Sequence, residues 1–338
     1  MKNVIDNHYH SFRERSSLKK ICLPLILSLL LLLTACGGQK SSNAGTNEGA
    51  AGAENAAAAN ANGSAAATEG TITYESENGP IEVPANPQRV IVVASYAGNV
   101  MALGVPLVGV DSWSKMNPRY QDHLAGVEEI SEENIEKIIE LDPDLIIGLS
   151  TTKNLDKLKE IAPTVTYTYG KVDYLTQQLE IGKLLNKEKE AQAWIDDFKA
   201  RAAEAGEQIR AKIGDKTVSV IESYDKQLYV FGDNWGRGTE VLYQAMKLNM
   251  PEKVKEMALQ DGYYALSAEV LPEYAGDYLI ISKYLDQENA FQQTESYKNI
   301  PAVKNGQVFE ANAKEFYFND PITLDYQLDF FKSHFLGN

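Results

Sequence analysis

The 338-residue sequence is poor in cysteine, which forms crosslinks, and in histidine, which together with cysteine binds zinc. It has two cysteines and four histidines, and the histidines are scattered along the chain. Two cysteines cannot form a disulfide framework or a cysteine-based zinc site, and the histidines lack the close spacing of a helical zinc site. Positive charge is also in deficit, because 32 Lys and Arg face 47 Asp and Glu. A nucleic-acid binder with an extended basic face is therefore not expected.

Motifs of common enzyme classes are absent as well. The sequence contains no Gly-x-Ser-x-Gly elbow, no phosphate-binding Gly-x-x-x-x-Gly-Lys and no His-Glu-x-x-His. Its composition, 44% hydrophobic and 23% charged, is that of a globular protein long enough for two domains. We expect no enzymatic activity, and an exported α/β hydrolase is the alternative from another class.

The N-terminus carries an export signal. Basic residues precede the apolar run 21–33, which is too short to span a bilayer permanently and ends in Leu33-Thr34-Ala35-Cys36. Residues 1–35 are therefore predicted to be a signal peptide. The tetrad resembles the lipobox of bacterial lipoproteins, which implies that Cys36 is lipidated and anchors the mature protein to the membrane.

The segment 36–70 is predicted to be a tether between the lipid and the folded part. After Cys36 it is rich in Ala and Gly and has no Val, Ile, Leu, Met or aromatic residue, so it cannot bury a core.

The remainder predicts an α/β fold in two lobes, 71–172 and 214–338. Short apolar segments alternate with helical patterns in both halves, and two of them, 90–94 and 144–149, are continuous apolar runs typical of buried parallel strands. The predicted strands are 90–94, 107–111, 144–149, 164–169, 217–221, 228–231, 278–281 and 308–311. Ser131, followed by two glutamates, is predicted to start a helix.

Residues 173–213 are predicted to form a helical bridge. Apolar residues recur with helical spacing and no strand pattern interrupts them, although Asn186 marks a possible break. A simpler interpretation is two ordinary packed helices inside one domain.

The two halves also share a short pattern. Glu136, Glu140 and Asp144 precede one apolar run, and Glu269, Glu273 and Asp277 precede another with the same spacing. The offset of the two patterns is about half of the folded part, as duplication of a lobe requires.

Several segments together resemble one family, the siderophore-binding lipoproteins of bacterial ABC importers, which have two Rossmann-like α/β lobes joined by one long helix. They are 89–92, 103–105, 108–110, 134–138 and 142–147, and the stretch 229–240 (YVFGDNWGRGTE) resembles the ferric hydroxamate binders of Gram-positive bacteria. The resemblance implies a ligand in the cleft between the lobes, and no covalent cofactor.

Physical chemistry supports the stretch 229–240 as part of a ligand site. Tyr229 lies in a predicted strand, and the glycine-rich turn after it displays Trp235 and Arg237. An indole offers a flat apolar wall and a guanidinium offers forked donors, which match the hydrocarbon arms and the iron–oxygen core of a ferric hydroxamate. Ligands of open α/β sheets bind beyond the carboxyl ends of strands, where we expect this loop to lie.

The other lobe is expected to supply the opposite wall of the site. Its candidates follow predicted strand ends, and a further candidate, Tyr317, precedes the last helix. An equally good interpretation is that these residues are ordinary half-buried aromatics and a solvated arginine. The candidates of this lobe are Tyr96, Trp113, Arg119 and Tyr167, and Tyr317 is a further candidate in the C-terminal lobe. None is assigned as an iron ligand, because a hexadentate siderophore fills the coordination sphere of iron.

The sequence therefore predicts a monomeric, lipid-anchored receptor on the extracytoplasmic face of a Gram-positive cell membrane. It would capture a ferric hydroxamate siderophore and deliver it to an ABC permease. A catecholate siderophore, haem or cobalamin is the alternative ligand, and Lys115 and Lys153 would be the extra cations for a catecholate.

The resemblance further implies that Glu136 and Glu269, one from each lobe, dock on arginines of the permease. The alternative is that both are helix-start acids that favour the helix dipole.

Overall fold

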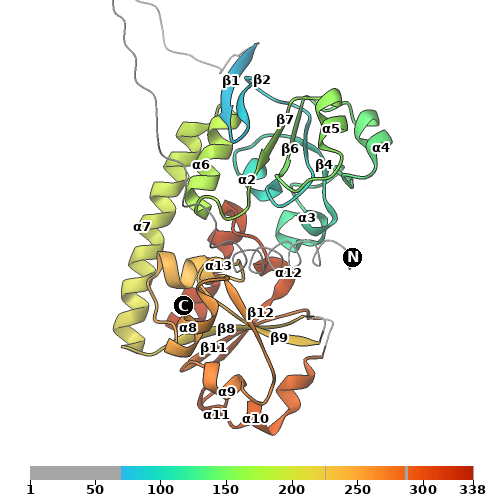
Figure 1. Cartoon of the computed structure of the whole chain (residues 1–338). Coiled ribbons are helices and arrows are strands. Elements are labelled where there is room, and N and C mark those ends of the chain that lie inside the picture. Colours follow the sequence, from blue (N-terminus) through green and yellow to red (C-terminus); the bar gives the residue numbers. More distant parts are fainter. Residues whose placement is uncertain (1–69, 225, 286–287, 338) are drawn as a thin grey trace, which may run out of the picture. The chain divides into compact units, whose positions relative to one another are not determined.

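Two five-stranded sheets organise the part of the chain that the computed structural model describes, residues 70–224, 226–285 and 288–337 (Figure 1). Each sheet is the centre of one α/β lobe, as expected. Within the described residues, no helix has both the length and the apolar character needed to cross a membrane.

The sheet of the N-terminal lobe is parallel throughout, in the order β5-β4-β3-β6-β7. Val90 and Val92 pack into the cluster that includes helices α2 and α6, whereas Ile91 packs on the opposite face with α4 and α5. Burial of both faces explains the continuous apolar runs. The elements are β1 (Thr71–Ser76), β2 (Gly79–Pro84), β3 (Val90–Val92), α2 (Ala97–Ala102), β4 (Leu107–Val110), α3 (Ser112–Met116), the 3₁₀ turn η1 (Pro118–Tyr120), β5 (Glu128–Glu129), α4 (Ile135–Glu140), β6 (Leu145–Leu149), α5 (Leu155–Ile161) and β7 (Thr164–Tyr167).

The sheet of the C-terminal lobe is mixed, in the order β10-β9-β8-β11-β12. Strands β8, β11 and β12 are parallel, but β9 runs antiparallel to both β8 and β10. The elements are β8 (Val218–Tyr224), β9 (Gln227–Phe231), the π-helix η2 (Glu240–Ala245), α8 (Glu252–Ala258), β10 (Tyr263–Leu266), α9 (Leu271–Tyr274), β11 (Tyr278–Lys283), the 3₁₀ turn η3 (Ala290–Gln293), α10 (Glu295–Lys298), α11 (Pro301–Lys304), β12 (Val308–Asn312), α12 (Ala313–Phe316) and α13 (Pro321–Leu336).

All eight predicted strands are present, with small differences at their ends. The hairpin β1–β2 and the strands β5 and β10 were not predicted. β5 has only two residues and β10 only four, which is too few for an alternating pattern that stands out from its surroundings.

The predicted helical bridge consists of α6 (Tyr174–Leu184) and α7 (Glu188–Ile213). The chain breaks between them where Asn186 adopts a left-handed backbone conformation with φ of 55°. Ala191, near the start of α7, belongs to the core of the N-terminal lobe, whereas Phe198 and later apolar residues of α7 belong to the core of the C-terminal lobe. Helix α7 therefore joins the two cores.

Helix α13 joins the same two cores from the other end of the chain. Phe318 and Ile322, around its first turn, pack against the N-terminal core, and Leu324, Leu328 and Phe331 lie in the C-terminal core. The carboxylate of Asp320 caps the helix and accepts a hydrogen bond from the hydroxyl of Tyr120. The sequence predicted one bridging helix, and the connection through α13 was not predicted.

The third acids of the shared pattern, Asp144 and Asp277, make similar hydrogen bonds in the two lobes. Asp144 accepts hydrogen bonds from the backbone N–H groups of Gln88 and Arg89, just before β3, and Asp277 accepts one from that of Thr217, just before β8. Each acid thus fixes the start of the strand that pairs with its own.

The helix starts assigned to the repeat need correction. Helix α4 begins at Ile135 with Asn134 as its cap, because the Asn134 side chain accepts a hydrogen bond from the Lys137 N–H; the predicted start at Ser131 is wrong. Glu136 lies in the first turn of α4, but Glu269 lies in the turn that precedes α9. The two glutamates are therefore not equivalent in secondary structure.

Gly98 of α2 provides a test of the contact between α13 and the N-terminal lobe. A methyl group at Gly98 would overlap the Asp320 carboxyl group and the Tyr120 hydroxyl. Helix propensity alone favours Ala over Gly by about 1 kcal/mol, but overpacking of a buried site costs about 1–3 kcal/mol. We therefore expect Gly98→Ala to lower the free energy of unfolding in urea. Ala102→Gly, at the exposed end of α2, is the control and should cost no more than about 1 kcal/mol. Equal stability of Gly98→Ala and the wild type would contradict this packing.

Candidate functional site

The loop 232–239 holds Arg237 against the segment that precedes α13. Gly236, Arg237 and Gly238 all have positive φ, and the Arg237 N–H donates to the carbonyl oxygen of Phe316 at 2.6 Å. A side chain at Gly236 would collide with the backbone of Tyr317, so the turn requires glycine there. Because β9 is antiparallel, the expectation that this loop follows a carboxyl end of the parallel sheet is wrong; the turn and its contact with Phe316 place the loop instead.

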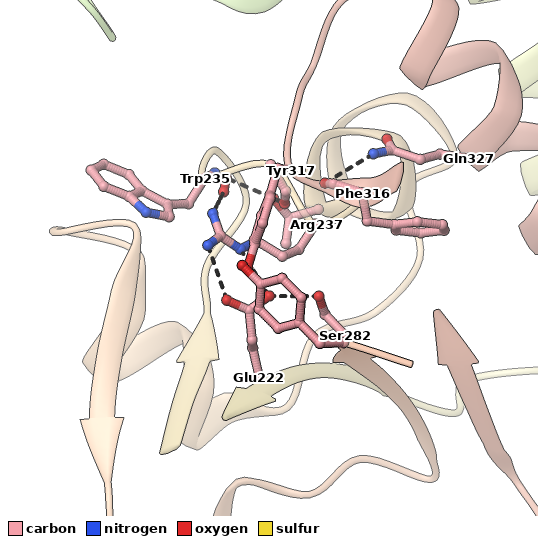
Figure 2. A network of polar contacts seen from close by, with 10 residues as sticks. Glu222, Trp235, Arg237, Ser282, Phe316, Tyr317 and Gln327 are labelled. Carbon is pink, nitrogen blue, oxygen red and sulfur yellow. Dashed lines mark hydrogen bonds and ion pairs between the residues drawn. The ribbon is translucent and has the colours of Figure 1, made fainter. Parts of the chain in front are cut away.

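The guanidinium of Arg237 is enclosed on several sides, as Figure 2 shows. Its Nη2 lies 3.0 Å from Oε1 of Glu222, and its Nη1 donates to the carbonyl oxygen of Trp235 at 3.1 Å. Its carbon lies 4.5 Å from the ring centre of Tyr317 and 4.8 Å from that of Phe231. Arg237 is thus a fixed, charge-paired group with 13% of its side chain exposed.

Aromatic side chains of the two lobes meet around Arg237. Trp113 contacts Tyr317 edge to face with ring centres 5.4 Å apart, and Tyr169 contacts Trp235 in the same way at 5.8 Å. We call these four residues the junction aromatics. Each pair joins one residue of the N-terminal lobe to one of the C-terminal lobe, so both lobes contribute to one aromatic surface.

The aromatic surface continues on the C-terminal lobe. Trp235 also contacts Tyr263 at 5.2 Å, and Tyr263 contacts Tyr229 at 5.9 Å. The hydroxyl of Tyr317 donates to that of Tyr284 at 2.6 Å. Burial raises the pKa of the Tyr169 and Tyr317 phenols, so they are neutral hydrogen-bonding groups at neutral pH.

A second buried carboxylate, Glu240, stabilises the loop itself. Its oxygens accept hydrogen bonds from the Gly236 N–H, the Asn319 amide and the Thr239 hydroxyl, at 3.0 to 3.1 Å. Burial raises the pKa of Glu240, and these hydrogen bonds oppose the shift.

Tyr96 and Tyr167 lie in the core of the N-terminal lobe, and Tyr169 packs against the same cluster. Tyr96 and Tyr167 are 4% and 2% exposed and contact each other edge to face. The hydroxyl of Tyr167 lies 3.2 Å from that of Tyr74, whereas the hydroxyl of Tyr96 has no hydrogen-bond partner among the described residues. The Tyr167 hydroxyl is therefore engaged inside the lobe, whereas the buried Tyr96 hydroxyl is left as a hydrogen-bond donor without a partner among the described residues.

Arg119 takes part in a different contact between the lobes. Its guanidinium pairs with Glu315 at 2.6 Å and lies 4.0 Å from the ring centre of Tyr326. The two lysines of the catecholate alternative are also engaged, because Lys115 donates to the Leu124 carbonyl and Lys153 pairs with Glu133.

Four residues of this region were missed by the sequence analysis. Tyr169 and Tyr284 follow the carboxyl ends of the parallel strands β7 and β11, so the strand-end rule would have found them. Tyr263 lies on β10, which was not predicted. Glu222 is an acid that directly follows the apolar stretch of β8, and that signal was available.

The remaining candidates lie away from the junction aromatics or outside the described residues. Glu136 and Glu269 are exposed, and a hydrogen bond from Ser267 lowers the pKa of Glu269. A surface groove of about 530 Å³ between α4 and α5 is lined by Ile135, Ile139, Asp142, Lys157, Glu160 and Ile161. No cluster of three metal-ligating side chains occurs in the described residues. Cys36, the predicted leader and the tether up to residue 69 lie outside them.

Comparison with known proteins gives close matches over most of the chain. The family model described as periplasmic binding protein matches residues 90–315. The iron(3+)-hydroxamate-binding protein FhuD of Bacillus subtilis is 35% identical over 92% of this chain and 96% of its own length. A second protein of B. subtilis, the iron(3+)-hydroxamate-binding protein YxeB, is 33% identical over 90% of this chain and 92% of its own.

The fold also matches solved structures. FhuD2 of Staphylococcus aureus with bound ferrioxamine B is 36% identical and superposes with a TM-score of 0.72, over 74% of this chain and 99% of the other. The FhuD protein of S. pseudintermedius is 35% identical with a TM-score of 0.73, over 80% and 99% of the two chains.

Proposed function

Because the chain belongs to the periplasmic binding protein family, we propose that it binds a ferric hydroxamate siderophore outside the cytoplasm and delivers it to an ABC permease. The observation that carries the proposal is the aromatic surface from both lobes around a charge-paired arginine. Aromatic faces suit the hydrocarbon arms of a hydroxamate siderophore, and phenol hydroxyls suit the oxygens around its iron. Relatives at 35% and 33% identity are named for the same ligand class.

The charges around the site favour a hydroxamate over a catecholate. A ferric tris-catecholate is a trianion, and it needs cations that are not already balanced. The four basic groups considered for that purpose are engaged: Arg237 with Glu222, Arg119 with Glu315, Lys153 with Glu133, and Lys115 with a carbonyl oxygen. A ferric tris-hydroxamate core is neutral and needs no such cations. The exported hydrolase is not proposed, because the matching family consists of binding proteins.

Tryptophan fluorescence gives the direct test of the ligand class. The chain has three tryptophans, of which Trp113 and Trp235 are junction aromatics and Trp194 stacks on Phe198 of α7. We expect ferrioxamine B to quench the fluorescence at low concentration, and a ferric tris-catecholate, haem and cobalamin to bind far more weakly. Trp235→Ala should weaken ferrioxamine B binding by about 1.5–3 kcal/mol, or ten- to a hundredfold, because it removes an aromatic wall.

Trp194→Phe is the matched control for this titration. It removes an indole outside the site, so affinity and most of the quench should remain. Unchanged affinity in Trp235→Ala would remove the loop from the site, and tight binding of the catecholate would overturn the proposed ligand class.

Attachment to the membrane forms a second part of the proposal. The apolar run and the Leu-Thr-Ala-Cys tetrad support cleavage after residue 35, lipidation of Cys36 and a tether up to residue 70. Two acyl chains hold a protein on a membrane stably, whereas one exchanges.

The cysteines therefore differ in their expected effect on localisation. Cys36→Ser should release the protein from the membrane fraction of cells, and Cys22→Ser, inside the leader, should leave it there. Mass spectrometry that finds membrane-bound protein with an unmodified Cys36 would contradict the anchor.

Docking on the permease forms the third part. Glu136 and Glu269 are exposed carboxylates on different lobes, and a permease with two related halves offers matching arginines. The placement of Glu269 before α9, outside the helix, weakens the alternative that both acids serve a helix dipole.

The double variant Glu136→Ala/Glu269→Ala should keep its siderophore affinity while uptake of iron by cells falls sharply. Glu204→Ala/Glu207→Ala removes two exposed acids from α7 and should leave uptake unchanged. Normal uptake by the first variant, at normal protein abundance, would mean that the two acids do not dock.

A further inference from the structure

Glu222 is a buried acid at the centre of the C-terminal sheet. It lies on β8, directly opposite Ser282 of β11, and both residues are 0% exposed. Its Oε1 accepts from Arg237, and its Oε2 accepts from the Ser282 hydroxyl at 2.6 Å and lies 3.4 Å from Nε of Arg237 (Figure 2). The carboxylate is thus held from two sides and faces the guanidinium.

Stability does not explain why an acid occupies this position. Removal of two charges from water is costly, and replacement of a buried ion pair by apolar residues is often neutral or stabilising. The preceding residues of β8 are apolar or small, so the strand itself does not require a carboxylate at this place. A buried pair beside a ligand site is better explained by an effect on the ligand.

The position of the pair suggests what that effect is. Arg237 contacts Tyr317 and Trp235, two of the junction aromatics, so any ligand on this surface lies close to the guanidinium. Glu240, another buried acid near the loop, accepts hydrogen bonds from Gly236 and Asn319. The carboxylate of Glu222 pairs directly with Arg237 at 3.0 Å, and interactions between charges in a partly buried site are only weakly screened.

Building on the proposed function, we infer that Glu222 sets the charge selectivity of the site. With Glu222 paired to Arg237, the surface around Arg237 is close to neutral and favours ferric chelates that are neutral or cationic. Without Glu222, the uncompensated guanidinium would attract anionic chelates. Glu222 acts through Arg237, so it is a positioning and specificity residue that does not itself touch the ligand.

The test uses three ligands that share one iron-binding core. Ferrioxamine B is cationic through its free ammonium group, its N-acetyl derivative is neutral, and its N-succinyl derivative is anionic. Affinities of wild type and Glu222→Gln for all three are measured by fluorescence titration. We expect Glu222→Gln to shift the ratio of anionic to cationic affinity toward the anion by about tenfold or more.

The double variant Glu222→Gln/Arg237→Gln removes both charges and should return the ratio close to that of wild type. Glu207→Gln is the control: it removes an exposed carboxylate from α7 and should leave the ratio unchanged. A purely structural role for Glu222 would weaken all three ligands alike and would not change their ratio.

Each outcome decides the inference. An unchanged ratio in Glu222→Gln, or a double variant that does not restore the ratio, overturns it. If Glu222→Gln does not fold, Arg237→Gln is measured instead. That variant leaves the Glu222 carboxylate without its partner, so the ratio of anionic to cationic affinity must shift toward the cationic ligand. No shift in Arg237→Gln would also overturn the inference. Failure of the wild type to bind any of the three ligands would instead overturn the proposed function.

Discussion

The first turn of α13 is fixed inside the N-terminal lobe, and the arrangement of the candidate site depends on this contact. Asp320 caps the helix, accepts a hydrogen bond from the buried Tyr120, and packs on a glycine of α2 where no side chain fits. The residues just before it, Phe316 and Tyr317, receive the Arg237 loop and Trp113. One short segment therefore connects both lobes and carries the centre of the aromatic surface.

The same segment explains why Arg237 can be rigid. A long arginine side chain on a surface loses conformational freedom when it binds, which costs affinity. Here the glycine turn, the Glu222 carboxylate and the Tyr317 ring hold the guanidinium in place. The site thus combines a fixed, balanced charge with aromatic faces, a combination that suits a bulky ligand whose core carries little net charge.

The sequence predicted the parts of the fold that depend on local patterns. Short apolar segments identified eight strands, and helical spacing identified α6 and α7, including the break at Asn186. The antiparallel β9 and the insertion of α13 into the N-terminal lobe depend on contacts between distant residues, which no local pattern contains. Trp235, Arg237 and Trp113 were found as residue types. Tyr169 and Tyr284 were missed although they follow strand ends, and Glu222 although it follows an apolar stretch, because their contacts with the loop come from distant parts of the chain.

We expect α7 and α13 to hold the lobes in a nearly fixed relation, so that the site exists before the ligand arrives. A large closure would have to bend α7 and separate Asp320 from Tyr120, which breaks hydrogen bonds in buried surroundings. Small-angle X-ray scattering of the Cys36→Ser protein, with and without ferrioxamine B, tests this directly. Nearly equal radii of gyration are expected, and a decrease of several ångströms on binding would contradict a fixed relation of the lobes.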